Sequence, residues 1–441
     1  MVVQRLSIGL AAVGLAIAGT IDPVGLSVAQ ANPQIYLPPF YAATNRLNPS
    51  GKPLGTVLAS EPVQASVPNA KAWRLAYVSS VPSGRRTVAT ALIAVPNGPV
   101  PTKGRPLVAW AHGTTGTARR CGPSQLPQPA QPLNQYLLPS GTSYSDFGLP
   151  AMEPLLSRGV VIVAPDYQGL GGPGKHNYAQ PISNGTDVIN ALRAARDFKP
   201  AAAGEKAVVY GWSQGGGATL GAASLKDYLQ RGDGAAPVNI LGFVAMAPED
   251  VGITIPASIN SEASAAAYLL SLNKQFSGNV FNFAHLAMMY QGLAAAEPGL
   301  KLSDLFTPQA VGEVEGIMER KCMHELSASF SYSYGSSYTS MLKAEPSNAL
   351  AWVQGIRKLS PSTTPLAPVV IYWGNNDTVV PPIMHKLYFE AACKQGAVIS
   401  RNELPGNNTH FSTPAASQPF FMPWILDRFA GKPILNGCPN I

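Results

Sequence analysis

The chain has 441 residues, only 12% of which are charged, and it contains 42 glycines and 41 prolines. Such a length allows a large hydrophobic core, and the composition excludes a disordered or coiled-coil chain. The formal net charge of +7 comes from scattered basic residues, with no cluster denser than Arg85-Arg86 or Arg119-Arg120. We interpret this charge as a solvated basic surface and expect no nucleic-acid partner.

The N-terminus has the pattern of an export signal. Met1–Arg5 carries one positive charge, Leu6–Ile21 is apolar, and Ala29-Gln30-Ala31 supplies a small-residue cleavage site. An apolar run of this length is short for a membrane span. We therefore expect residues 1–31 to be a cleaved signal peptide, with an uncleaved anchor as the alternative. The mature protein is expected to be secreted, or alternatively periplasmic, without a stable membrane anchor.

The next segment, residues 32–70, is rich in Pro and Asn and predicts an extended lead-in. Short apolar runs then alternate with helical stretches. The predicted strands are Ala72–Ser79, Val88–Val95, Leu107–Ala111, Val160–Ala164, Ala207–Tyr210, Ile240–Ala247, Val369–Trp373 and Val398–Leu404. The predicted helices are Thr186–Asp197, Gly216–Arg231, Pro382–Cys393 and Pro419–Phe429.

The order of these elements predicts an α/β fold. The first strands have no helices between them, which indicates an antiparallel edge. From Leu107 onward several strands are continuous apolar runs, as expected of parallel strands that are buried on both faces. We therefore expect a mostly parallel central sheet with right-handed crossovers.

One long interval, between Ala247 and Pro368, has no clear strand. It is rich in Ala, Ser and Met and includes the helical patterns Ser264–Leu272, Phe281–Ala296 and Val311–Met323. We interpret it as a helical cap inserted into the core. The expected organisation is a first part of the core at 32–247, a helical cap insertion at 248–345, and a second part of the core at 346–441.

Export also determines how the cysteines are interpreted. Their number is even, none forms a C-x-x-C pair, and none has a histidine at metal-ligand spacing; they are Cys121, Cys322, Cys393 and Cys438. In an oxidising compartment this predicts two disulfides and no metal site. At this point three pairings remain open.

The strongest chemical signal is the G-x-S-x-G motif at Gly211-Trp212-Ser213-Gln214-Gly215, which follows an apolar strand and opens a helix. That context is typical of a nucleophile on a tight strand-to-helix turn, where a side chain two residues to either side would collide. The helix N-terminus offers free N–H groups to a developing anion. We predict that Ser213 is the nucleophile of a serine hydrolase of the α/β-hydrolase class.

A serine nucleophile requires a histidine base and an orienting carboxylate, which this fold presents in the order Ser, acid, His. Asp377 follows the buried strand Val369–Trp373, and His410 follows Val398–Leu404 and a turn. They are therefore the predicted acid and base. The alternative acids are Asp250 and Asp166, and the other histidines are His112, His176, His285, His324 and His385.

An oxyanion hole requires two backbone N–H donors. Gln214, directly after the nucleophile, is expected to supply one. The loop His112-Gly113-Thr114-Thr115-Gly116 follows a buried strand and is similar to the oxyanion loop of lipases and esterases, which favours Thr114 for the other. An ordinary glycine turn is the alternative.

The chain resembles the secretory lipase family. The segments that carry the resemblance are His112-Gly-Thr-Thr-Gly, Asp166-Tyr-Gln-Gly-Leu-Gly, Gly211-Trp-Ser-Gln-Gly-Gly, Asp377-Thr-Val-Val-Pro and Asn408-Thr-His. The resemblance implies a triacylglycerol lipase or carboxylesterase with a helical cap, the catalytic residues Ser213, Asp377 and His410, and no metal or organic cofactor. It also supports the pairing of Cys121 with Cys322 and of Cys393 with Cys438.

The expected partner is an ester or lipid substrate, with a lipid–water interface as one possible setting. Cap residues could form an acyl pocket or could be the packed core of the cap; they are Phe276, Phe281, Phe283, Met288, Met289 and Tyr290. A secreted serine peptidase or acyltransferase would use the same fold and triad. A non-catalytic binding protein is a further alternative, which the complete set of Ser, Asp and His disfavours.

Overall fold

The computed structural model describes residues 37–141, 145–231 and 234–438. The predicted signal peptide lies outside these residues. Within the described chain, no helix is long and apolar enough to cross a membrane.

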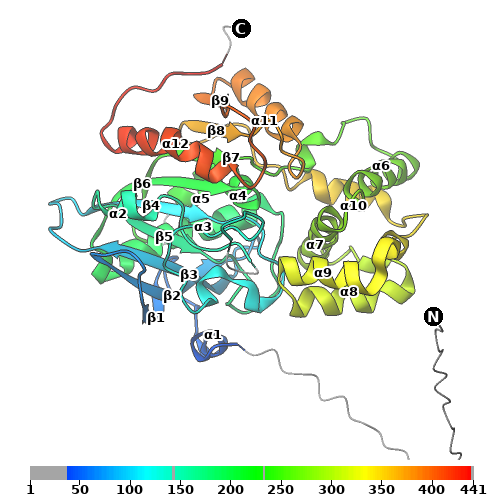
Figure 1. Ribbon diagram of the computed structural model, residues 1–441, viewed down its shortest axis with the longest axis horizontal. Helices are drawn as coiled ribbons and strands as arrows, with labels where there is room; N and C mark the ends of the chain where they lie inside the picture. The colour runs from blue at the N-terminus through cyan, green and yellow to red at the C-terminus, as the bar shows by residue number, and fades with distance from the viewer. Residues whose placement is uncertain (1–36, 142–144, 232–233, 439–441) are drawn as a thin grey trace, which may run out of the picture. The chain divides into compact units, whose positions relative to one another are not determined.

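The described residues form a nine-stranded sheet with the order β1-β2-β3-β5-β4-β6-β7-β8-β9 (Figure 1). β1 to β3 and the β3–β5 pair are antiparallel, whereas all pairs from β5 to β9 are parallel. The predicted, mostly parallel sheet is therefore confirmed. The strands are β1 Val57–Val63, β2 Ala70–Ser80, β3 Arg86–Pro96, β4 Arg105–Ala111, β5 Val161–Pro165, β6 Ala203–Trp212, β7 Asn239–Met246, β8 Val369–Trp373 and β9 Ile399–Glu403.

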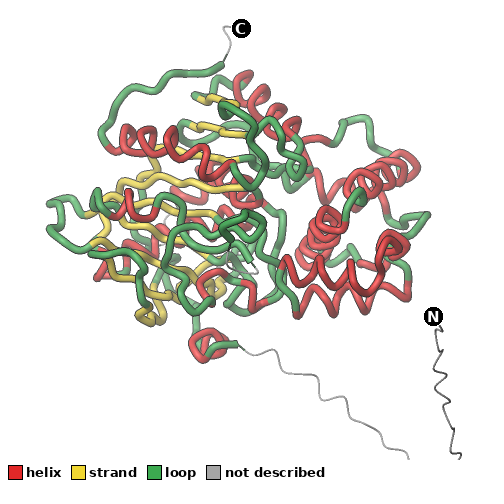
Figure 2. The backbone as a smooth tube through the Cα atoms, in the orientation of Figure 1, coloured by secondary structure: helices red, strands yellow, loops and turns green. Residues whose placement is uncertain are grey.

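Helices cover both faces of the sheet (Figure 2). Residues on β4 alternate between two cores: Ala109 belongs to the core that includes residues of α3, α4 and α11, whereas Val108 belongs to the core that includes residues of α2 and α12. This alternation follows from the two-residue period of a strand, and it explains why the parallel strands are apolar throughout. The helices are α1 Pro39–Ala43, α2 Met152–Leu156, α3 Pro181–Asp197, α4 Gln214–Ala223, α5 Lys226–Gln230, α6 Glu262–Phe276, α7 Val280–Ala296, α8 Pro308–Arg320, α9 Met323–Tyr334, α10 Ala349–Arg357, α11 Pro382–Lys394 and α12 Thr413–Phe429.

Three local predictions were wrong. The lead-in contains a strand, because Val57–Val63 pairs with β2 along its length. Its Pro62 is tolerated because β1 is an edge strand. The helix expected over Gly216–Arg231 is divided into α4 and α5 by Ser224 and Leu225. The last helix was predicted to begin at Pro419. It begins at Thr413, so Pro419 and Pro423 both lie inside it.

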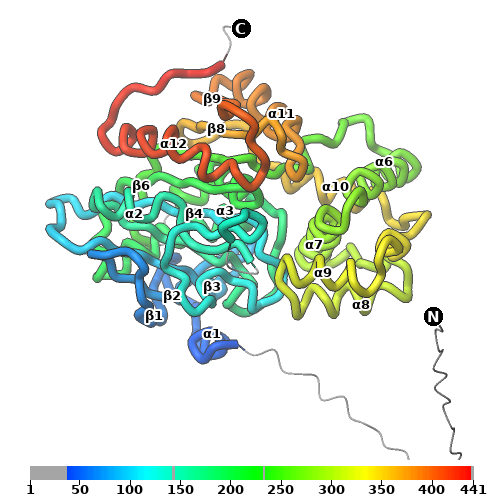
Figure 3. Tube along the Cα trace, viewed as in Figure 1, coloured from blue at the N-terminus to red at the C-terminus, as the bar shows by residue number. Residues whose placement is uncertain are grey.

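A helical segment, α6 to α10, lies between β7 and β8 and gathers at one side of the sheet (Figure 3). It has its own hydrophobic core, in which Tyr290 of α7 packs on Trp352 of α10 with ring centroids 5.4 Å apart. The Glu262 carboxylate of α6 accepts the Ala349 and Leu350 N–H groups, so it caps α10. α10 therefore packs with the cap helices, although it lies beyond the expected cap boundary at residue 345.

Both disulfides supported by the family resemblance are formed. Cys121–Cys322 joins the loop after β4 to the residue before α9, and the Met323 N–H donates to the Thr115 carbonyl at 2.9 Å beside it. Cys393–Cys438 joins α11 to the C-terminal tail. The first disulfide therefore fixes one corner of the cap to the loop that follows β4.

Because Cys121 and Cys322 are 201 residues apart and Cys393 and Cys438 only 45, chain entropy stabilises the first link more, by about 5 against about 4 kcal/mol. We expect replacement of Cys121 and Cys322 by Ala to lower the free energy of unfolding more than the matched Cys393/Cys438 replacement. Denaturant titration measures this difference. Peptide mapping without reductant checks the pairing, and peptides that link Cys121 to Cys393 or Cys438 would overturn it.

Candidate active site

Ser213 stands on a tight turn between β6 and α4. Its backbone has φ +61° and ψ −123°, a left-handed conformation that is costly for a residue with a side chain. The turn is held by three backbone hydrogen bonds: Ser213 N–H donates to the Met246 carbonyl at 2.9 Å, and the Ser213 carbonyl accepts from Gly217 N–H at 3.0 Å and from Glu249 N–H at 3.2 Å. The surrounding sheet thus imposes the conformation that presents the hydroxyl at the carboxyl end of β6.

The glycines on either side of Ser213 allow close backbone contacts. A side chain at Gly215 would overlap the carbonyl oxygen of Ala111, the last residue of β4, and one at Gly211 would overlap the Gly215 carbonyl oxygen. The turn therefore packs directly on the end of the neighbouring strand. This contact also brings the loop after β4 to Ser213, because a Cβ placed on Gly113 would lie 3.5 Å from the Ser213 Cβ.

The structure brings Ser213, Asp377 and His410 together from three separate loops. The Ser213 hydroxyl lies 2.9 Å from His410 Nε2, and His410 Nδ1 lies 2.7 Å from Asp377 Oδ2. A carboxylate at Asp377 only accepts hydrogen bonds, so Nδ1–H donates to it and Nε2 is left to accept the serine proton. The other carboxylate oxygen accepts the Val379 and Val380 N–H groups, at 2.9 and 2.8 Å. This arrangement fixes both the tautomer and the orientation of the imidazole.

The alternative acids are engaged elsewhere. Asp250 accepts the Ser360 hydroxyl at 2.6 Å and the Ile253 N–H at 3.1 Å. Asp166 accepts hydrogen bonds from Thr90 and Ser124. Within the described chain, neither contacts His410 by a hydrogen bond.

The remaining histidines are held away from the Ser213 hydroxyl by other partners. Their contacts are His112 with the Gly113 carbonyl, His176 with Gln214, His285 with the Phe281 carbonyl, His324 stacked on Tyr136, and His385 with Arg401. Burial lowers the pKa of His285, the cap histidine nearest the site, to about 4. It is therefore neutral near pH 7.

Both predicted oxyanion donors lie beside Ser213. Gln214 is the first residue of α4, so its N–H has no partner within the helix. Thr114 follows Gly113 in the adjacent loop and lines a cavity together with Ser213 and His410. In the part of the chain that the structure describes, neither N–H donates to another backbone carbonyl. Both are therefore free to bind an anion.

Two small cavities adjoin Ser213, and cap residues close them. The first is lined by Glu249, Phe276, Asn282, His285, Val379, Val380 and Met384. The second is lined by Thr114, Asp146, Trp212, Phe281, His285, Met323, His324, Val379, His410 and Phe411. Of the cap side chains singled out from the sequence, Phe276 and Phe281 thus face the site. The other four are buried in the core of the cap: Phe283, Met288, Met289 and Tyr290.

Three residues of the site were missed by the sequence analysis. Asp146 lines the second cavity, and burial raises the pKa of its carboxyl to about 6. Tyr178 contacts Thr114, and Glu249 lines the first cavity. None of them lies in a recognisable motif, since tertiary contacts alone bring them to the site.

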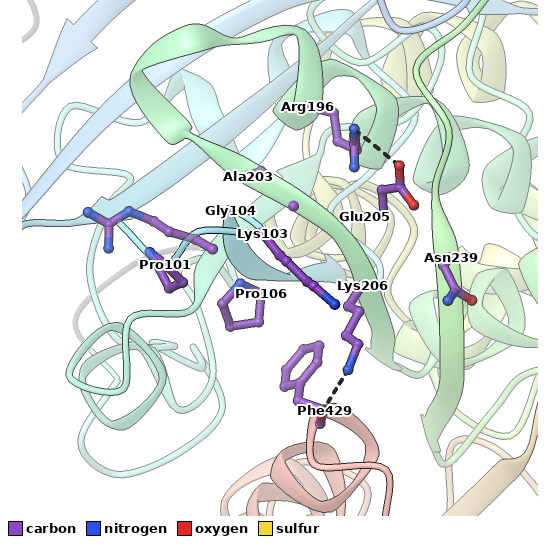
Figure 4. Close-up of a pocket in the computed structure, with 12 residues that line it drawn as sticks. Pro101, Lys103, Gly104, Pro106, Arg196, Ala203, Glu205, Lys206, Asn239 and Phe429 are labelled. Carbon is purple, nitrogen blue, oxygen red and sulfur yellow. Dashed lines mark hydrogen bonds and ion pairs between the residues drawn. The ribbon is translucent and has the colours of Figure 1, made fainter. Parts of the chain in front are cut away.

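A larger hollow of about 780 Å³ lies elsewhere (Figure 4). It is formed by the starts of β4 and β6 and the end of α12, at the opposite ends of the strands from Ser213. Two of its cations have partners within the protein: Arg196 lies 3.8 Å from Glu205, and Lys206 donates to the Phe429 carbonyl at 3.2 Å. The described residues that line it include no serine, cysteine or histidine, so it contains no serine–histidine pair like that at Ser213.

The described residues contain no group of three His, Cys, Asp or Glu side chains that could hold a metal ion. The strand-to-helix turn at Ser213, together with the His410 and Asp377 side chains that later loops bring to it, defines the class of the protein as an α/β-hydrolase.

Comparisons with known proteins agree with this class. A model of the secretory lipase family matches residues 137–437. Lipase 10 of Candida albicans is 24% identical over 422 residues, which cover 91% of this chain and 82% of that protein. A secreted triacylglycerol lipase of Malassezia globosa is 26% identical over 421 residues, covering 91% and 83%.

Solved structures show the same fold. Lipase A of Candida antarctica in its closed state aligns with a TM-score of 0.66 at 17% identity, covering 93% of this chain and 90% of that one. The rice cell wall degrading esterase LipA of Xanthomonas oryzae aligns with a TM-score of 0.61 at 16% identity, covering 86% and 98%. The chain belongs to the secretory lipase family, and it is accordingly a carboxylic ester hydrolase.

The conformation of Ser213 gives a stability prediction. Glycine adopts positive φ without penalty, so Ser213→Gly should be more stable than Ser213→Ala by about 1 kcal/mol. Both variants lack the hydroxyl, so thermal or denaturant unfolding isolates the backbone strain. At Ser224, where φ is −86°, the order of the matched Gly and Ala variants should reverse. An alanine variant at Ser213 that is as stable as the glycine variant would contradict the assigned strain.

Proposed function

We propose that this protein is a secreted lipase or carboxylesterase that hydrolyses esters through an acyl-enzyme on Ser213. The single observation that carries the proposal is the continuous hydrogen-bond chain from the Ser213 hydroxyl through His410 to Asp377. A serine hydroxyl is a weak nucleophile alone, and this chain supplies the base and its orienting carboxylate.

In the acylation step, the Ser213 oxygen attacks the ester carbonyl carbon while His410 Nε2 accepts the hydroxyl proton. The Asp377 carboxylate stabilises the imidazolium through Nδ1–H. The carbonyl oxygen becomes an oxyanion, which the N–H groups of Gln214 and Thr114 bind. The intermediate then collapses: the carbon–oxygen bond to the leaving alcohol breaks, and the alkoxide takes the proton from Nε2.

Deacylation repeats these steps with water. His410 Nε2 takes a proton from the water as its oxygen attacks the acyl carbon, and the same N–H groups bind the oxyanion. Collapse releases a carboxylic acid and returns the proton to the Ser213 oxygen. Since the N–H donors are fixed by the sheet and the helix start, they require little reorganisation when charge develops.

The substrate is proposed from the lining of the site and from the relatives. Phe276, Val380 and Met384 offer apolar contacts beside Ser213, which suit an acyl chain. One matched relative is a secreted triacylglycerol lipase, and family membership supports export of this chain as well. Esters of fatty acids are therefore the favoured substrates over peptide amides.

A substrate panel tests the function. Purified protein should hydrolyse p-nitrophenyl esters from acetate to palmitate and emulsified triglyceride, but not peptide amides. Ser213→Ala should fold normally and lose at least about 10³-fold in kcat/KM, because the covalent route is removed. A fluorophosphonate should label the wild-type protein stoichiometrically and leave the variant unlabelled. Cleavage of amides alone would favour a peptidase, and absence of all turnover a binding protein.

A second test addresses the acid. Asp377→Asn should reduce kcat by about 10³- to 10⁴-fold, since the amide no longer holds the reactive imidazole tautomer. Asp250→Asn is the matched control, because Asp250 is also a buried carboxyl but contacts Ser360, and it should change kcat little. A larger loss at Asp250 than at Asp377 would move the acid to the loop after β7.

A further inference from the structure

A buried carboxyl group that the proposed triad does not use lies in one of the two cavities beside Ser213. Asp146 is only 7% exposed, and it lines the second cavity together with Ser213 and His410. It lies in the loop before α2, so it belongs neither to the cap nor to the turns that carry the triad. Acylation and deacylation as proposed above require nothing from it.

The main chain of its own loop holds Asp146 in place. Phe147, the next residue, exchanges backbone hydrogen bonds with Asn134 at 2.8 and 3.1 Å, which pairs the two sides of the loop. Next to this pair, the Tyr136 N–H donates to Asp146 Oδ1 at 2.7 Å. One oxygen of the carboxyl group is therefore fixed by the backbone.

The other oxygen, Asp146 Oδ2, has no hydrogen-bond partner among the described residues, and none of their cations forms an ion pair with this side chain. Oδ2 is not enclosed by protein atoms, as the unpartnered Oδ2 of Asp250 is. It is therefore open to the cavity that Asp146 lines. A carboxylate oxygen that leaves water without gaining a donor costs free energy. This oxygen is suited to a donor that the substrate brings.

His410 indicates which part of an ester occupies this cavity. Its Nε2 gives the proton to the oxygen of the leaving alcohol, so that oxygen lies within hydrogen-bond distance of Nε2. His410 lines the second cavity but not the first. The alcohol part of the ester therefore extends into the second cavity, beside Asp146. The acyl chain is left to the first cavity, where Phe276 and Met384 lie.

We propose that Asp146 is a specificity-determining residue that accepts a hydrogen bond from a free hydroxyl on the alcohol part of the substrate. The substrate class is then esters of polyols that keep an unesterified hydroxyl near the scissile bond, such as mono- and diacylglycerols. This inference rests on the proposed ester hydrolysis at Ser213, and it adds the chemistry of the alcohol to it.

The charge of Asp146 sharpens this preference. Burial raises the pKa of its carboxyl to about 6, and the Tyr136 N–H and His410 oppose that rise. Above that pH the carboxylate only accepts hydrogen bonds, so it favours a hydroxyl over any group without a donor. A fully esterified glycerol presents only acceptor oxygens at the same place and leaves Oδ2 unpaired.

The test compares two butyrate esters that differ only in the hydroxyl groups of the alcohol, 1-monobutyrin and propyl butyrate. The ratio of their kcat/KM values, measured by titration of the released acid at pH 8, isolates the alcohol, because the acyl chain is the same. Asp146→Leu should lower this ratio by about ten- to hundredfold, the effect of one hydrogen bond to a charged group. The intrinsic reactivities of the two esters cancel when proteins are compared.

A second variant and a control accompany this measurement. Asp146→Asn keeps an oxygen for the Tyr136 N–H, and a neutral hydrogen bond is weaker, so the ratio should fall less, by about three- to tenfold. Glu249→Gln is the matched control, because Glu249 lines the first cavity. It should leave the ratio at the wild-type value, since both esters carry the same acyl chain. Each ratio reports on folded enzyme alone and does not depend on how much of a variant folds.

An unchanged ratio in Asp146→Leu would overturn the proposal, even if both esters reacted more slowly, because the carboxylate would then act on His410 or on the fold and not on the alcohol. A fall in the ratio for Glu249→Gln as large as that for Asp146→Asn would also overturn it, by placing the alcohol in the first cavity. Failure of the hydrolase assignment is distinguishable, because it would leave no Ser213-dependent turnover of either ester.

Discussion

The contact between the Ser213 turn and the end of β4 positions Ser213 and the two proposed oxyanion donors. Ser213 adopts a positive φ that costs about 1–3 kcal/mol, and the packing of the turn holds it there. Because Gly215 lies against the Ala111 carbonyl, the start of α4 and the loop after β4 lie next to each other. The two proposed oxyanion donors come from these two segments. The same close backbone packing between adjacent parallel strands therefore holds both the strained Ser213 and the two proposed oxyanion donors.

The proposed base, His410, and the proposed acid, Asp377, depend on a second backbone contact at the same edge of the sheet. The loops after β8 and β9 are joined where Asn376 N–H donates to the Asn408 carbonyl at 2.9 Å, and a side chain at Gly374 would overlap that carbonyl. Asp377 and His410 follow these contacts within two residues. The 2.7 Å bond between their side chains thus rests on main-chain pairing. Neighbouring parallel strands end at one edge, so residues distant in sequence meet there.

The sequence predicted those parts of the molecule that local patterns encode. Continuous apolar runs revealed the parallel strands, and the glycines around Ser213 revealed the turn, because both reflect constraints on nearby residues. β1 was missed because a half-buried edge strand containing Pro62 has little apolar signal. Tyr178 and Glu249 were missed for a different reason: only contacts between separate loops bring them to the site. The six apolar cap residues could not be sorted into site and core until the packing of α7 was known, since both environments select the same side chains.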